Sequence, residues 1–250
     1  MPSRARTLSS ILSGILLLGF VAWVTQDPTA FRRDWTLRLR MEQVEPGVYA
    51  RPGQAVDLRS GLLAELRSAE LATQQFFGSR LARPTIALAD APALKEYLAV
   101  GNPFAATFFH RDGILAVVTP RGLNAEVMAH MLAHAEIKHR IGEAAFARMP
   151  AWFDEGLSTL LDERPFLQDN ALDAKAAALK GMPDMHALTG REAFVGSEGE
   201  ANLVLAKLEV RRWHRIVGQD GVVGLLEALA GGAEFQAAYR AAEAAAGLPE

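Results

Sequence analysis

Two histidines, His130 and His134, stand four residues apart in a stretch that we expect to be helical. On an α-helix, residues at this spacing lie about 40° apart around the axis and one turn apart along it. Both imidazoles can therefore reach a single point in space, as a tetrahedral metal ion requires. The pair alone is a weak signal, because two histidines at this spacing also occur on ordinary helix surfaces.

A third metal ligand would have to come from another element. Asp154 and Glu155 begin twenty residues after His134, in the stretch Pro150-Ala-Trp-Phe-Asp-Glu-Gly-Leu-Ser, which has the pattern of a further helix. A carboxylate there would complete a set of two histidines and one glutamate. An acidic pair among aromatic residues of a buried type also needs a partner that offsets the cost of its burial.

The segment 125–161 resembles the peptidase MA-like branch of the gluzincins, a family of membrane-bound or exported zinc peptidases. The family signature is H-E-x-x-H followed by W-F-x-E-G, and it corresponds here to His130-Met-Leu-Ala-His134 and Trp152-Phe-Asp-Glu-Gly156. The resemblance implies a gluzincin-like fold, zinc as the cofactor, and hydrolysis in which the metal polarises a peptide carbonyl for attack by water. It also implies the three zinc ligands: His130, His134 and Glu155.

One position departs from that signature, because Met131 stands where the family has the glutamate that follows the first histidine. In the family, this carboxylate takes a proton from the attacking water and passes it to the leaving amine. A thioether can do neither. Since positioned acid–base catalysis contributes roughly 10²- to 10⁴-fold, we expect peptide hydrolysis to be lost or strongly weakened.

Two carboxylates are candidates for holding a ligand imidazole through its other nitrogen, a support that metal sites commonly have. Glu126 lies one turn before His130, and Asp154 is adjacent to Glu155. An acid early in a helix also interacts favourably with the helix dipole, so Glu126 has a second, purely structural interpretation.

Composition bounds the remaining possibilities. The chain has 250 residues, of which half are hydrophobic, and a net charge of −3. This is enough for one domain with a sizeable core, and the slight acidity argues against a nucleic-acid partner. The absence of cysteine excludes disulfides, thiolate zinc sites, iron–sulfur clusters and a cysteine nucleophile.

Residues 1–26 have the composition of a membrane segment. Arg4 and Arg6 precede an uncharged stretch, residues 7–26. Its apolar part, residues 8–24, would span about 25 Å as a helix, near the lower limit for crossing a bilayer. It has no A-x-A cleavage pattern, and Trp23 suits a membrane interface. We therefore predict an uncleaved single-pass anchor; the alternative is a signal peptide with a poor cleavage site.

The charges around this segment bear on its orientation. Arg4, Arg6 and the amino terminus favour an N-inside topology, which would place the domain in the periplasm or another extracytoplasmic space. Four arginines that follow the segment favour the opposite orientation: Arg32, Arg33, Arg38 and Arg40. We predict the N-inside topology.

The remaining chain, residues 27–250, is predicted to form one α+β domain, with a small mixed half followed by a helical half. Periodicity predicts strands at residues 37–49, 85–88, 104–109 and 114–119, the last two joined as a hairpin. It predicts helices at residues 58–77, 92–100, 123–141, 151–161, 170–180, 200–216, 222–229 and 235–246.

Three functions are compatible with these observations. The first is a membrane-anchored, zinc-binding pseudopeptidase that binds a protein or peptide ligand in its former active site. The second is a working zinc peptidase that uses a different base. The third is a helical interaction domain of a membrane complex that binds no metal.

Overall fold

The structure of the chain is a computed structural model that describes residues 28–98, 104–110, 113–168, 172, 189–195 and 199–247. The predicted anchor at residues 1–26 lies outside these ranges, as does the predicted helix at 170–180 apart from Leu172. Among the helices that are described, none is both long and apolar enough to cross a bilayer.

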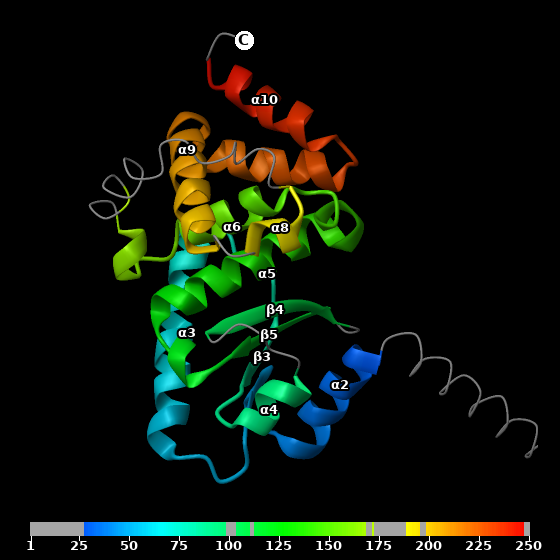
Figure 1. Ribbon diagram of the computed structural model, residues 1–250, viewed down its shortest axis with the longest axis vertical. Helices are drawn as coiled ribbons and strands as arrows, with labels where there is room; N and C mark the ends of the chain where they lie inside the picture. The colour runs from blue at the N-terminus through cyan, green and yellow to red at the C-terminus, as the bar shows by residue number, and fades with distance from the viewer. Residues whose placement is uncertain are drawn as a thin grey trace, which may run out of the picture.

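A mixed five-stranded sheet with the order β1-β2-β3-β5-β4 lies at the centre of the first half (Figure 1). The three middle strands β2, β3 and β5 run parallel, and each edge strand is antiparallel to its neighbour. This architecture agrees with the predicted α+β class. The strands are β1 (Glu42–Glu45), β2 (Val48–Ala50), β3 (Thr85–Leu88), β4 (Ala105–His110) and β5 (Gly113–Val118).

Helices cover both faces of the sheet. Successive side chains of a strand point to opposite faces, and apolar side chains on both faces are buried against helices. In β3, Ile86 and Leu88 join the core that contains α3 (Val56–Phe77) and α5 (Ala125–Phe146). Ala87 faces the other way, toward α2 (Pro28–Arg40) and α4 (Pro92–Tyr97). Helix α5 therefore lies directly across one face of the sheet.

The second half is helical and packs against the C-terminal part of α5 (Figure 1). Its helices are α6 (Ala151–Thr159), α8 (Arg191–Val195), α9 (Gly199–Ala230) and α10 (Phe235–Ala245), with short 3₁₀ turns η1 (Pro120–Gly122) and η2 (Pro165–Leu167) elsewhere. Phe153 of α6 contacts the rings of Trp213 and Tyr239 edge-on, and those two rings stack. This aromatic cluster fixes α6, and with it Glu155, against α9 and α10.

Most predicted elements are found, and one strand prediction is wrong. Residues 37–40 end helix α2, because Leu37 and Met41 pack at helical spacing under the sheet. The rest of the predicted strand is a hairpin that turns at Gly47, whose φ of 78° favours glycine.

Two glycines interrupt long helices close to the predicted ends. Gly142 (φ 74°) breaks α5 one residue after the predicted end at 141, and Gly218 (φ 67°) breaks α9 between the two predicted helices. At the other end of α5, the Asn124 side chain accepts a hydrogen bond from the Val127 amide (2.9 Å) and caps the helix.

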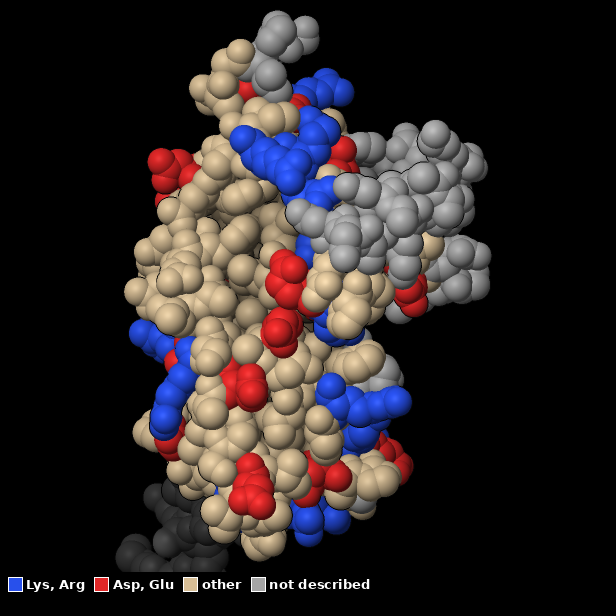
Figure 2. Space-filling model, turned by 90° about the vertical axis from the view of Figure 1, so that its left-hand side faces the viewer, with Lys and Arg blue, Asp and Glu red and all other residues tan. Residues whose placement is uncertain are grey.

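Figure 2 shows the α3 side of the molecule. Acidic and basic side chains are mixed on this face, and one group of basic side chains lies at the end where α9 and α10 lie. At that end, Arg212 binds the carboxylates of Glu209 and Glu243. Arg212 therefore has two acidic neighbours, one on α9 and one on α10.

The close contact between α6 and α9 makes the stability of the domain sensitive to Gly156. A Cβ atom there would lie 2.5 Å from Val210 Cγ2 and 2.7 Å from the Ala206 carbonyl oxygen. We expect Gly156→Ala to lower the free energy of unfolding by about 1–3 kcal/mol, because the two helices must separate. Urea unfolding measures this.

The control is Gly224→Ala on α9, where a Cβ would meet nothing within 4 Å. Its higher helix propensity should leave the stability unchanged or raise it by up to about 1 kcal/mol. Equal stability of the two variants would contradict the packing described here.

Candidate metal centre

Helix α5 presents three different faces to its surroundings. Met131 and Leu132 pack toward the sheet, and Ala133 and Ile137 pack toward the helical half. The remaining stripe, which contains His130, His134 and Lys138, faces a cavity of about 570 Å³. Edge strand β4 lines the opposite wall, and Glu155, Arg164 and Arg191 complete the lining.

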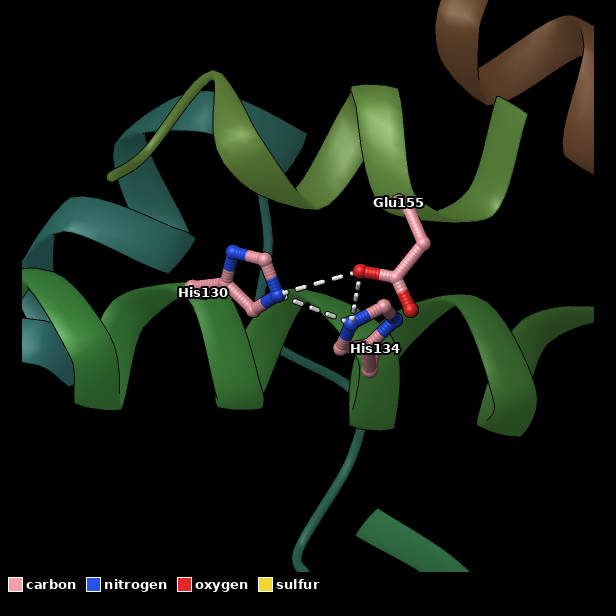
Figure 3. Close-up of side chains that lie close together, drawn as sticks. All are labelled: His130, His134 and Glu155. Atoms are coloured by element: carbon pink, nitrogen blue, oxygen red, sulfur yellow. Dashed lines mark hydrogen bonds and ion pairs between the residues drawn. The ribbon is translucent and has the colours of Figure 1, made fainter. Parts of the chain in front are cut away.

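The three predicted metal ligands converge in this cavity (Figure 3). His130 Nε2 lies 3.0 Å from His134 Nε2 and 3.6 Å from Glu155 Oε2, and His134 Nε2 lies 3.5 Å from Glu155 Oε2. A tetrahedral ion with bonds of about 2.0–2.1 Å separates its ligand atoms by about 3.3 Å. The cluster thus has the size and the donor atoms that a metal ion of this kind needs.

His134 is oriented through its second ring nitrogen. Its Nδ1–H donates to Asp154 Oδ1 at 2.8 Å, since an ionised carboxylate only accepts. Ser158 Oγ lies 3.1 Å from the same nitrogen. These contacts leave the Nε2 lone pair directed into the cavity. Asp154 therefore lies where the sequence analysis predicted a supporting carboxylate.

Asp162 supports His130, a role that the sequence analysis missed. Its Oδ2 lies 3.4 Å from His130 Nδ1, within electrostatic range but longer than an ordinary hydrogen bond. Arg164 donates to both Asp162 oxygens at 2.6–2.9 Å, and Lys207 donates to its carbonyl oxygen at 2.8 Å. The only sequence signal is its place seven residues after Glu155, just beyond the end of α6.

Arg191 of α8 holds the acidic pair from the other side. Its Nη1 donates to Glu155 Oε1 at 2.7 Å, and its Nη2 donates to Asp154 Oδ2. Glu155 is thereby fixed through one oxygen and presents the other to the histidines. No local pattern marks Arg191, because it is 36 residues away in a five-residue helix.

Neighbouring charges shift the pKa values of these groups. Burial by itself would raise the pKa of Asp154, but His134, Lys138 and Arg191 lower it to about 2. The histidines likewise hold the pKa of Glu155 well below its usual range despite its burial. Burial would lower the pKa of His130, yet the carboxylates of Asp162 and Glu155 raise it to about 9. Without a metal, His130 is therefore protonated at neutral pH.

The other two residues singled out in the sequence lie in different surroundings. Met131 is buried (2% exposed) between the cavity and the sheet-side core. Because its side chain is a thioether, the residue after His130 cannot transfer a proton. Glu126 is exposed in the first turn of α5 and bonds to neither histidine. The described groups next to the Nδ1 atoms of the two imidazoles are Asp154, Ser158 and Asp162, so Glu126 does not have the supporting role for which it was a candidate.

Comparisons with protein-family models, with curated proteins and with solved structures found no match to this chain. The gluzincin resemblance therefore rests on the two sequence motifs and stays a prediction.

The raised pKa of His130 makes the stability of the metal-free protein depend on pH. An unfolded histidine has a pKa near 6.5, so protonation of His130 stabilises the fold fully below about pH 6.5. This contribution is lost as the pH rises through about 9. We expect urea unfolding in the presence of a chelator to show decreasing stability across this window.

A variant without the titrating group provides the comparison. His130→Gln should flatten the slope, whereas His139→Gln, on an exposed side of the same helix, should keep it. The lowered carboxylate pKa values add nothing to the slope, because these groups are ionised throughout the window. A slope that is unchanged in His130→Gln would assign the effect to another group.

Proposed function

We propose that residues 27–250 form a gluzincin-like, zinc-binding domain that has lost most or all of its hydrolytic activity and acts by binding a protein or peptide. The observation that carries the proposal is the convergence of His130, His134 and Glu155 on one point, next to Met131. The ligand set favours retained metal binding, and the methionine favours loss of catalysis.

Zinc fits this donor set better than calcium or magnesium do. Two imidazole nitrogens and one carboxylate oxygen are typical of zinc sites, whereas the harder cations prefer oxygen ligands alone. A bound zinc would supply Lewis acidity for polarising a carbonyl. The chain itself holds the ligands in place through Asp154, Asp162 and Arg191, each bonded or close to one of them.

The described carboxylates near the cluster are poorly suited to replace the missing base. Asp154 is bound by His134 and Arg191, and Asp162 is bound by Arg164. Glu155 belongs to the ligand set. Glu143 also lines the cavity, but it is exposed beyond the break at Gly142, nine residues after His134. This arrangement supports a binding role over one in which another base takes over.

The cavity suits an extended peptide. Strand β4 ends the sheet, so among the described strands it has a neighbour on one side only. A strand at the edge of a sheet can accept the backbone of a peptide as an additional strand. Residues 104–109, which include all of this strand except its last residue, form one wall of the cavity opposite the histidines. A peptide paired with β4 would therefore pass the metal ligands.

Features of α2 support the proposal that residues 1–26 anchor the domain in a membrane, with the domain on the extracytoplasmic side. The helix begins at Pro28, directly after the apolar segment. Trp35 (53% exposed) and Leu39 (61% exposed) lie on its open surface beside the exposed Arg32 and Arg38. Aromatic, aliphatic and basic side chains together are typical of a surface close to lipid headgroups.

Metal content is the first test of this proposal. We expect about one zinc per chain after purification of the full-length chain without chelator, and almost none in His130→Ala/His134→Ala. Asp162→Asn should weaken zinc affinity by about 10- to 100-fold, because it removes the support of His130. Glu126→Gln, a matched control on α5, should bind zinc like the wild type. A wild-type chain that stays metal-free after reconstitution would favour the non-metal domain.

Restoring the missing carboxylate tests the loss of hydrolysis. Met131→Glu, loaded with zinc, should cleave a mixed-sequence, internally quenched peptide library at least about 10²-fold faster than the wild type. The control Met131→Gln has similar size and cannot transfer the proton, so it should remain as slow as the wild type. Rapid, chelator-sensitive cleavage by the wild type itself would instead support an active peptidase with a different base.

A further inference from the structure

Lys138 is a buried cation that the metal centre does not use. It lies one turn beyond His134 on α5, is only 6% exposed and lines the cavity. Its ammonium is 4.0 Å from the centroid of the Phe146 ring and 5.9 Å from that of Phe109. Within the described part of the chain, it forms no hydrogen bond or ion pair.

The other cations of the lining differ from Lys138 in this respect. Arg191 is bound by the acidic pair of α6, and Arg164 is bound by Asp162. Arg33 donates from Nε to the Leu98 carbonyl oxygen at 3.0 Å and stacks on a β4 ring. Each of these side chains has protein partners that account for its position.

Burying a charge without a counter-ion is costly. Burial and, to a smaller extent, the positive charge of Arg191 lower the pKa of Lys138, and the carboxylates of Asp154 and Glu155 act against that shift from a distance. The contact with Phe146 is a cation–π interaction, which stabilises an ammonium less than a bonded carboxylate does. An ammonium has three N–H donors, and among the described residues none of those of Lys138 has a hydrogen-bond acceptor, so they are available to an acceptor inside the cavity.

We propose that Lys138 binds a carboxylate of the peptide that occupies the cavity. This inference rests on one part of the proposed function, the binding of a peptide in the cavity. It does not depend on the binding of a metal ion. Phe109 and Phe146 meet edge-to-face, with ring centroids 5.5 Å apart, and form an apolar wall beside the ammonium. The carboxylate would pair with Lys138, and the apolar atoms next to it would contact these rings.

The carboxylate has two sources in a peptide: the C-terminus, or an aspartate or glutamate side chain. Three pools of dye-labelled hexapeptides of mixed sequence distinguish them. The first pool contains no acidic residues and ends in an amide, the second differs only in its free C-terminal carboxylate, and the third ends in an amide and carries one internal glutamate. Fluorescence anisotropy with the full-length chain measures binding.

We expect the second or the third pool to bind roughly 10- to 100-fold more tightly than the first, the gain typical of a hydrogen bond to a charged group. Preference for the second pool identifies a C-terminal carboxylate, and preference for the third identifies an acidic side chain. Equal binding of all three pools, or binding of none, would overturn the inference.

Variants link the preference to this lysine. Lys138→Met keeps the length of the side chain and should abolish the preference, whereas Lys138→Arg should retain most of it. Lys95→Met on α4, on the other face of the sheet, is the control. A preference that survives in Lys138→Met would also overturn the inference. If Lys138→Met does not fold, equal binding of the three pools by the wild type still overturns the inference, and Lys138→Arg still tests whether a cation at this position keeps the preference.

Zinc content of the same preparations separates this inference from the proposed function. Lys138→Met should retain the zinc of the wild type, because Lys138 is not one of the three ligands. If the wild-type chain binds zinc and binds all three pools equally, the proposed function stands and only the inference about Lys138 is overturned. If the chain prefers peptides with a carboxylate but contains no zinc, the inference about Lys138 stands and the proposed zinc binding is overturned.

Discussion

Helix α5 is shared by the two halves of the molecule, and the rest of the structure depends on this constraint. One side of it belongs to the core over the sheet and another to the core of the helical half. The stripe of His130, His134 and Lys138 faces the cavity. Because packed cores tolerate little displacement, the direction of these three side chains is set by two cores at once.

The charged groups behind that stripe are buried with matching partners. Asp154 has Arg191, Asp162 has Arg164, and the fully buried Glu136 accepts from Arg140 and from two backbone amides of the loop before β3. Removing one member of such a pair leaves an uncompensated buried charge, which costs more than the pair contributes. The network therefore holds the imidazoles and Glu155 rigidly, as a metal site requires.

The same geometry separates binding from catalysis. His130, His134 and Glu155 converge, Asp154 and Asp162 lie behind the imidazoles, and β4 is an edge strand among the described strands. In the proposed function these features bind a metal ion and a peptide. Proton transfer needs one additional carboxylate at the position of Met131. The Met131 side chain packs in the apolar core beneath α5, and in the proposed function it stands in place of the carboxylate on which hydrolysis depends.

Local spacing in the sequence was enough to predict the histidine pair, most helices and the β4–β5 hairpin, because helical and strand periodicity are properties of neighbouring residues. The choice of Glu155 as the third candidate ligand came from the resemblance to the gluzincins. Local spacing failed at residues 37–40, where packing under the sheet decided between helix and strand. Asp162, Arg191 and the isolated position of Lys138 depended on the tertiary structure alone. Their roles arise from contacts between segments far apart in the chain, and burial, which sets their charge states, exists only once both cores have formed around α5.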